Sequence, residues 1–270
     1  MARIVFNLWP GGRPRAVTLS YDDGVVEDRR LVEILNRYGL KGSFHLNSGM
    51  LGRENKLAPG EVAALFAGHE ISAHSVNHPH LDAVPRGQLA QEMLDDRRAL
   101  EALAGYPVRG MSYPFGTYSG EIVASLPALG IEYARTVESH GRFHVPENFL
   151  LWHPTCHHKH DLAKKTEEFL ALAQIPWRRP MALLYVWGHS FEFPKDDNWD
   201  VMERFGESIA REEATIWRAT NIEIVDYVNA VRRLRVDVEG TRVLNPSAVP
   251  VWITWGDAPR EIPAGALVSL

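Results

Sequence analysis

Two adjacent carboxylates, Asp22 and Asp23, end a run of residues that favours a β-strand, from Ala16 to Tyr21. Gly24 follows them and permits a sharp turn, since glycine tolerates positive φ. The carboxyl ends of strands are where α/β folds place their chemistry. Neighbouring carboxylates repel unless a cation or a proton separates their roles, and a metal ion does this by binding one and leaving the other free to move protons. The alternative is that the pair only caps the helix that follows.

Two histidines four residues apart, His74 and His78, form a second group. They point the same way if the segment makes one helical turn. Pro79 permits little helix, because the residue before proline avoids the α region, so we expect a single turn or a tight loop at a strand end. Neutral imidazoles suit Zn²⁺, and Asp23 is the natural oxygen ligand to complete a site that keeps an open position. A surface or capping histidine pair is the alternative, but parallel sheets bring successive strand ends together, which favours the metal site.

A further histidine, His189, follows a nearly all-apolar run from Met181 to Trp187. That run has the length of a buried strand. We therefore expect His189 to face the same edge of the sheet as the carboxylates. A histidine that is not needed as a ligand suits general acid catalysis there. The alternative is a structural histidine that is hydrogen-bonded by the backbone.

Strand and helix patterns alternate along most of the chain. Helices are predicted over 25–38, 61–67, 87–104, 122–129, 161–173, 200–214 and 223–234, and strands over 16–21, 42–46, 69–73, 108–113, 131–136, 150–152 and 181–187. This alternation predicts an α/β fold with a parallel sheet and helical crossovers, and the length suits a barrel closer to seven strands than eight. Short alternating segments spaced by glycine then predict a small antiparallel β appendage, so we expect one domain over 1–234 and the appendage over 235–270.

The motifs together resemble those of the polysaccharide deacetylase family, carbohydrate esterases with a NodB-type domain. They are Asp-Asp-Gly at the first strand end, His-Ser-x-x-His, the turn Tyr113–Gly116 with Pro between aromatics, and a late strand that ends in histidine. The resemblance covers roughly residues 14–234 and implies a distorted (β/α)7–8 barrel. It implies Asp23, His74 and His78 as the metal triad, Asp22 as the catalytic base and His189 as the catalytic acid. The backbone N–H of Phe115 could serve as an oxyanion donor, since that role needs no side chain.

Departures from the family pattern indicate a divergent branch. Ser112 stands where the family usually has an arginine that tunes the base, and the Asp-Trp motif that holds this arginine has no clear match. Phe115 replaces a tyrosine, and Trp187 replaces the leucine that usually lines the acyl pocket. We therefore expect no fixed cation beside Asp22 other than the metal ion.

Several residues near these motifs have no role in them. Segment 152–160 is dense in histidine and could make a second metal site, but ligands adjacent in sequence rarely reach one ion. A loop at the mouth, with His153 or His158 touching substrate, is the preferred interpretation. Phe191 could stack on a sugar or anchor its loop. His45 ends a predicted strand and could face the mouth or point sideways.

The expected function is metal-dependent hydrolysis of an N- or O-linked acetyl group on a carbohydrate. The expected cofactor is a divalent ion, Zn²⁺ first, with Co²⁺, Ni²⁺ or Mn²⁺ as alternatives. The same machinery could hydrolyse another non-peptide C–N bond, as in a cyclic amide or ureide, because fold does not choose the substrate. The alternative from a different class is a catalytically silent protein that binds metal and carbohydrate. The expected partner is an acetylated carbohydrate or a related small-molecule amide, and the oligomeric state stays open.

Charge and composition exclude other classes of protein. The net charge is −5 and the pI about 6.2, so no basic surface points to nucleic acid. No apolar run is long enough to cross a bilayer, and residues 1–10 lack the core of a signal peptide. We therefore expect no nucleic-acid or membrane partner and a cytoplasmic location. The single cysteine, Cys156, excludes an internal disulfide.

Overall fold

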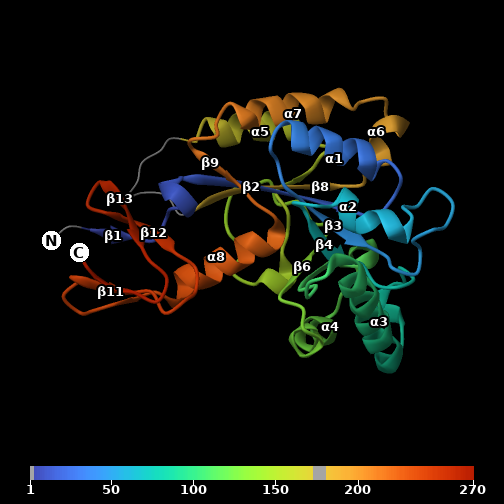
Figure 1. The fold of residues 1–270 in the computed structure, drawn as a ribbon, viewed down its shortest axis with the longest axis horizontal. Helices are drawn as coiled ribbons and strands as arrows, with labels where there is room; N and C mark the ends of the chain where they lie inside the picture. Colours follow the sequence, from blue (N-terminus) through green and yellow to red (C-terminus); the bar gives the residue numbers. More distant parts are fainter. Residues whose placement is uncertain (1–2, 173–180) are drawn as a thin grey trace.

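A parallel sheet lies at the centre of the computed structural model, which describes residues 3–172 and 181–270 (Figure 1). The strands of this sheet are β2 (Arg15–Asp22), β3 (Gly42–Leu46), β4 (Glu70–Ala73), β5 (Gly110–Ser112), β6 (Tyr133–Arg135), β7 (Cys156–His157), β8 (Ala182–Gly188) and β9 (Ile216–Arg218). Their order is β6-β5-β4-β3-β2-β8-β7, and β9 pairs with the start of β2. All of these pairs are parallel, so the carboxyl ends of the strands meet at one edge.

The segment 152–157 curls the sheet toward a barrel. Trp152 exchanges backbone hydrogen bonds with β6, donating to Ala134 O at 3.0 Å and accepting from Thr136 N at 3.1 Å. Thr155 N then donates to Tyr185 O of β8 at 2.8 Å. One short segment therefore joins β6, at one end of the strand order, to β8, near the other end. The predicted distorted α/β barrel is confirmed.

Helices cover the sheet on both sides. They are α1 (Asp28–Arg37), α2 (Val62–Leu65), α3 (Arg86–Ala104), α4 (Gly120–Ser125), α5 (Leu162–Leu170), α6 (Glu192–Lys195), α7 (Asp200–Ala210) and α8 (Asn221–Arg233). In Figure 1, α1, α5 and α7 lie together on one side of the central strands and α8 lies on the other. No helix in the ranges 3–172 and 181–270 is long and apolar enough to span a membrane.

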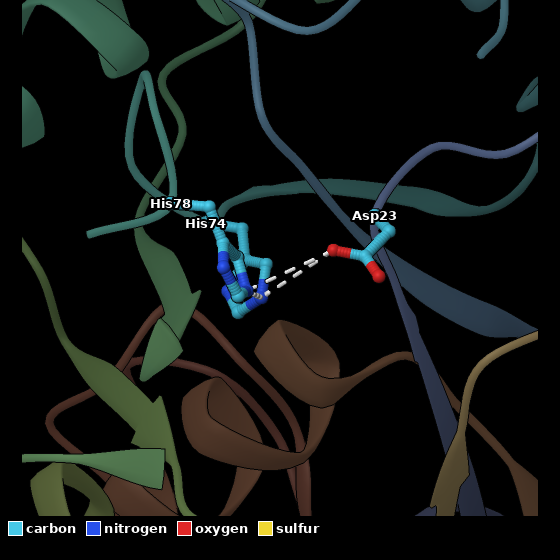
Figure 2. A group of neighbouring side chains, drawn as sticks. All are labelled: Asp23, His74 and His78. Carbon is cyan, nitrogen blue, oxygen red and sulfur yellow. Dashed lines mark hydrogen bonds and ion pairs between the residues drawn. The ribbon is translucent and has the colours of Figure 1, made fainter. Parts of the chain in front are cut away.

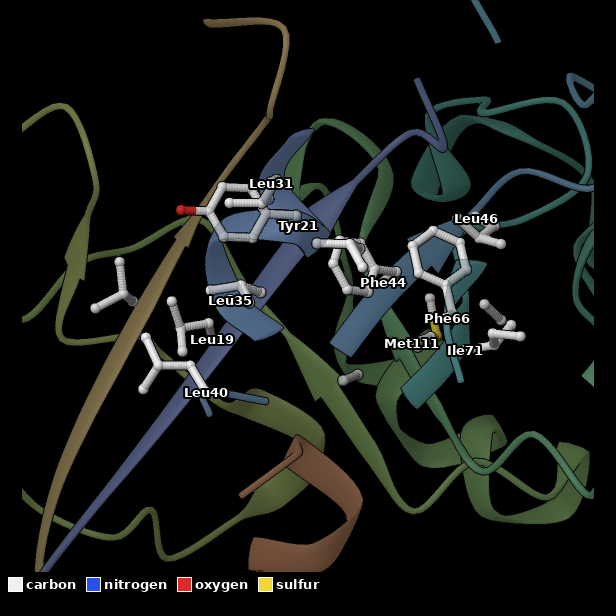
Figure 3. Packing of buried hydrophobic residues seen from close by; sticks show 14 of the residues in the cluster. Leu19, Tyr21, Leu31, Leu35, Leu40, Phe44, Leu46, Phe66, Ile71 and Met111 are labelled. Carbon is white, nitrogen blue, oxygen red and sulfur yellow. The ribbon is translucent and has the colours of Figure 1, made fainter. Parts of the chain in front are cut away.

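The main hydrophobic core lies between β2 and the helices that cover it. Leu31 and Leu35 of α1 pack beside Leu19 and Tyr21 of β2 (Figure 3). Phe44 of β3 extends the same core and lies in the same view. This packing fixes β2 in the centre of the sheet, and β2 carries the two carboxylates at its end.

The strands that follow α8 form two small antiparallel sheets, one of which also includes an N-terminal strand. One contains β10 (Arg235–Val236), β11 (Arg242–Leu244) and β14 (Leu267–Ser269), and the other contains β12 (Val251–Trp255), β13 (Ala258–Ile262) and β1 (Ile4–Val5). Tyr227 of α8 links the second sheet to the barrel, because its OH donates to Leu8 O at 2.9 Å and accepts from Trp252 N at 3.0 Å. An N-terminal strand thus joins the C-terminal sheet, and the division at 234/235 stays a prediction.

Some predicted elements differ from the structure. The predicted strand 150–152 is wrong, because Phe149–Leu151 form a 3₁₀ turn that begins where Asn148 Oδ1 accepts from Leu150 N at 2.9 Å. The strands β7 and β9 were not predicted, since two or three residues are too few to show an alternating pattern. Ala173, the last residue of the predicted helix 161–173, lies outside the described residues.

Candidate metal and catalytic site

The two carboxylates lie at the carboxyl end of the central strand. Asp22 is the last residue of β2 and pairs in register with His45 of β3. Asp23 follows in the left-handed region, with φ of 84°, and its N–H donates to His45 O at 2.9 Å. The helix-capping alternative is wrong, because α1 begins only at Asp28.

His74 and His78 lie on a tight loop after β4, and that loop is not helical. Ser75 and His78 both have positive φ, 64° and 55°, and His78 N donates to Ser75 Oγ at 3.1 Å. The two imidazoles point to one place, which Asp23 also faces (Figure 2). The Nε2 atoms lie 3.0 Å apart, and Asp23 Oδ1 lies 3.9 Å from His74 Nε2 and 3.8 Å from His78 Nε2.

These three side chains fit a divalent metal ion. Bonds of about 2.0–2.2 Å at tetrahedral angles separate ligand atoms by roughly 3.4 Å, and the three observed separations bracket that value. His74 Nδ1 lies 2.9 Å from Ser112 O, an arrangement that leaves Nε2 unprotonated for a metal ion. Burial lowers the pKa of His74 to about 4 and also lowers the pKa of His78, so both rings stay neutral, as ligation requires.

A buried arginine holds the expected base, and the sequence-based expectation that no fixed cation lies beside Asp22 is wrong. Arg135 ends β6, is fully buried and forms an ion pair with Asp22 Oδ2. Its guanidinium carbon lies 4.4 Å from the centre of the Trp187 ring. Ser112, on the adjacent strand β5, donates its hydroxyl to Asp22 Oδ1 at 3.1 Å. The family arginine would stand at the position of Ser112 on β5. Here the cation, Arg135, comes from the neighbouring strand β6.

The surroundings of Asp22 favour its ionised form. Burial alone would raise the pKa of this carboxyl, but the charge of Arg135 and the neighbouring imidazoles of His74 and His45 lower it well below its usual range. The sequence does contain a signal for this ion pair, because Arg135 stands near the carboxyl end of the predicted strand 131–136. It was not identified as a partner of Asp22. His45 was a second signal; its side chain is fully buried beside the base, with Nδ1 3.2 Å from Asp22 Oδ1.

His189 follows β8 and is paired with a carboxylate that the sequence did not reveal. Glu192 Oε2 lies 3.4 Å from His189 Nδ1 and accepts from His189 N at 3.1 Å. Burial lowers the pKa of His189, but Glu192, Asp22 and Asp23 together raise it above its usual value. The imidazole therefore has a higher protonated fraction at neutral pH than an isolated histidine.

A second cluster of possible ligands includes part of the histidine-rich segment. His157, His189 and Glu192 offer atoms within 4.8 Å of one another. However, His157 Nδ1 accepts from Lys159 N at 3.1 Å, so the proton of the neutral ring is on Nε2, 3.1 Å from Glu192 Oε2. A metal ligand would need the opposite tautomer, so this cluster fits a hydrogen-bonded set better than an ion. His158 is buried, with Phe193 stacked 4.1 Å from its ring.

Phe115 lies directly beside the metal triad. Its backbone is in the left-handed region, with φ of 57°, and its side chain is 56% exposed. The ring lies 4.4 Å from the ring of His78 and stacks on His80 at 4.0 Å. The structure thus brings all six predicted residues to one edge of the sheet, while the role of each stays a prediction.

Comparison with known proteins agrees with this geometry. Residues 11–134 match the family model described as polysaccharide deacetylase. The predicted resemblance is therefore confirmed over this stretch. A chitooligosaccharide deacetylase from Sinorhizobium fredii is 26% identical over 120 residues, 43% of this chain and 54% of the relative. The chain spans about half the length of the curated relatives it matches.

Solved structures share the fold over more of the chain. A candidate polysaccharide deacetylase from Mycobacterium smegmatis superposes with a TM-score of 0.62 at 18% identity, covering 83% of this chain and 93% of its own. A family 4 carbohydrate esterase from Streptomyces lividans, solved in complex with acetate, has a TM-score of 0.52 at 14% identity and covers 77% and 93%. At such identities the likeness concerns the fold alone.

Proposed function

We propose that the protein is a metal-dependent hydrolase that removes an N- or O-linked acetyl group from a carbohydrate. The observation that carries the proposal is the convergence of Asp23, His74 and His78 beside a buried, ionised Asp22. A protein that only binds metal or sugar needs neither a second carboxylate next to the triad nor a protonated histidine. The family match and the acetate complex of a structural relative favour acetyl groups as the substrate.

Asp23, His74 and His78 would hold the ion, and two imidazoles with one carboxylate make Zn²⁺ the first candidate. Co²⁺, Ni²⁺ and Mn²⁺ are the alternatives. A divalent ion bound there supplies Lewis acidity and lowers the pKa of water from about 15.7 to roughly 7 in favourable zinc sites. The remaining steps fall to residues of the chain.

Asp22 takes the proton of the attacking water at its carboxylate. Arg135 contacts Oδ2 of that carboxylate and Ser112 donates to Oδ1. The backbone N–H of Phe115 donates to the oxyanion of the tetrahedral intermediate. His189 gives a proton to the leaving nitrogen or oxygen, and Glu192 at its Nδ1 keeps the ring oriented.

The experiment that tests the proposal measures acetate release. Chelator-treated protein is assayed on N-acetylated glucosamine oligomers and on an O-acetylated polysaccharide, before and after addition of one divalent ion at a time. We expect release only after the ion is added, and the substrate that responds identifies the linkage. Hydrolysis of a cyclic amide without acetate release would favour the other C–N bond class. Metal and sugar binding without any hydrolysis would favour the silent binding protein.

A further inference from the structure

A chain of buried polar side chains lies behind the base, on the side away from the metal triad. His45 is fully buried between two of its members. Its Nδ1 lies 3.2 Å from Asp22 Oδ1, and its Nε2 lies 3.5 Å from the hydroxyl oxygen of Tyr133. The imidazole therefore connects the carboxylate of the base to a tyrosine of β6.

The far end of this chain is anchored firmly. The hydroxyl of Tyr133 donates to Glu70 Oε1 at 2.8 Å and lies 2.6 Å from Ser72 Oγ. Glu70 Oε2 accepts from Ser43 Oγ at 2.6 Å and from Ile222 N, in the first turn of α8, at 3.0 Å. Two strands, β3 and β4, and helix α8 thus fix the position of the Tyr133 hydroxyl, and Tyr133 limits where the ring of His45 can lie.

Burying polar groups costs free energy unless they are hydrogen-bonded, so this network needs a reason that packing alone does not supply. Burial lowers the pKa of His45, so the ring is neutral and carries one proton. Nδ1 is the nitrogen next to the carboxylate, which can only accept, whereas Nε2 faces a hydroxyl. The charged neighbour decides the tautomer: a proton on Nδ1 faces the carboxylate at 3.2 Å, while Nε2 keeps only a 3.5 Å contact with the Tyr133 hydroxyl, whose own proton goes to Glu70.

Arg135 alone does not fix the base. The arginine is paired with Asp22 Oδ2, and a carboxylate held at one oxygen can still rotate about its side-chain bonds. His45 and Ser112 both lie at Oδ1, 3.2 and 3.1 Å away. Contacts at both oxygens define the plane of the carboxylate, and that plane decides where its free lone pair points.

We propose that His45 is a positioning residue for the base, donating Nδ1–H to Asp22 Oδ1 while Tyr133 and Glu70 hold its ring in place. The proposal rests on the proposed function, because it takes Asp22 as the base. In the structure His45 Nδ1 lies within reach of Asp22 Oδ1 but is poorly aligned for a hydrogen bond. Catalytic hydrogen bonds are often long or poorly aligned before substrate binds and tighten when it does. His45 touches neither the ion nor the substrate.

Three substitutions of His45 separate positioning from a general structural role. The side-chain nitrogen of Asn can take the place of Nδ1, that of Gln can take the place of Nε2, and Phe fills the space without a donor. We expect His45→Asn to keep kcat within about threefold, and His45→Gln and His45→Phe to lose about tenfold or more, because small misplacement of catalytic groups is costly. KM and the metal content stay unchanged in all three.

The matched control is His69→Phe. His69 is a buried histidine near the other end of the sheet, where Nδ1 accepts from Gly42 N at 3.0 Å, so its loss changes stability and leaves kcat unchanged. Equal losses in His45→Asn and His45→Gln, or an unchanged kcat in His45→Phe, would overturn the proposal.

A measurement without substrate decides the contact itself. Nitrogen-15 NMR of the histidine rings, with His45 assigned by the signals missing in His45→Asn, should show Nδ1 protonated and Nε2 not. The opposite tautomer would overturn the proposal even if kcat falls in the variants. Wild-type protein that shows the expected tautomer but releases no acetate would count against the proposed function and not against the His45–Asp22 contact.

Discussion

Asp22 shows how the charges of neighbouring residues decide what one side chain can do. Its two oxygens meet a guanidinium, a hydroxyl and an imidazole, and these outweigh the cost of burial. The motifs around Asp22 and Asp23 made this pair predictable. Arg135 was not predicted, because the sequence cannot show that the curled sheet brings the end of β6, more than a hundred positions later, to the end of β2.

Replacing Arg135 by Met should destabilise the protein strongly. The change leaves Asp22 as a buried carboxylate without its ion-pair partner, and breaking a buried pair in this way costs about 3–5 kcal/mol. Denaturant unfolding of Arg135→Met beside Ser112→Ala measures the difference, and the serine variant should lose less, since it removes only a neutral donor. Similar losses in the two variants would show that the ion pair has no special role.

Asp28 gives a prediction about pH. Burial raises the pKa of this carboxyl to about 8, although Ser190 Oγ donates to it at 2.5 Å. A raised pKa in the folded state means that its contribution to stability is fully present below the unfolded pKa, about 3.8, and is lost as pH rises toward 8. Asp28→Asn keeps an acceptor for Ser190 and has no such loss.

The free energy of unfolding of Asp28→Asn relative to wild type should therefore increase between pH 5 and pH 8, by up to about 1.4 kcal/mol per pH unit. Chemical unfolding at several pH values measures this. A difference between the two proteins that does not change with pH would contradict the raised pKa.

At the scale of elements, the ends of strands position the site. The long strand β8 was predictable because burial on both faces gives a continuous apolar run, and β2 because most of its residues favour a β-strand. The strand pairing of the segment after residue 150 was not predictable, since it depends on distant strands and not on the pattern of apolar residues in the segment itself. The loop that carries His74 and His78 was predictable as a tight loop from Pro79, but the positive φ of its residues was not.

Gly188, the last residue of β8, should not tolerate a side chain. A Cβ there would lie 2.0 Å from His158 Nδ1, and the ring of Phe193 prevents His158 from moving away easily. We expect Gly188→Ala to lower the free energy of unfolding by about 1–3 kcal/mol and to reduce the rate by displacing His189. Gly87→Ala is the matched control, because nothing lies within 4 Å of that position in α3. Equal stability in the two variants would contradict the close packing at β8.

At the scale of the whole molecule, the barrel and the C-terminal sheets share a second hydrophobic core. Trp9, Tyr227 and Ile253 belong to it, from the N-terminal segment, α8 and β12. Short alternating segments separated by glycines predicted the antiparallel strands after Leu234. The pairing of β1 with β12 was not predictable, because its partners are about 250 residues apart and β1 has only two residues.

This core should support stability and not chemistry. Ile253→Ala should lower the free energy of unfolding by about 2–5 kcal/mol, as for other large-to-small changes in a core, and leave the metal content and the rate per folded molecule unchanged. The control is Val238→Ala, since Val238 is 99% exposed and its change should stay within about 0.5 kcal/mol. Loss of the ion in folded Ile253→Ala protein would show that the C-terminal sheets take part in the site.

The measurement that tests the central claim most directly is the metal content per chain of wild type, Asp22→Asn and Asp23→Asn, determined beside the rate of acetate release. We predict about one divalent ion in wild type and in Asp22→Asn, with at least about a hundredfold loss of rate in the latter, as expected when a general base is removed. Asp23→Asn should lose most of the ion. Loss of the ion in Asp22→Asn, or its retention at full occupancy in Asp23→Asn, would contradict the assignment of one carboxylate to the metal and the other to the proton.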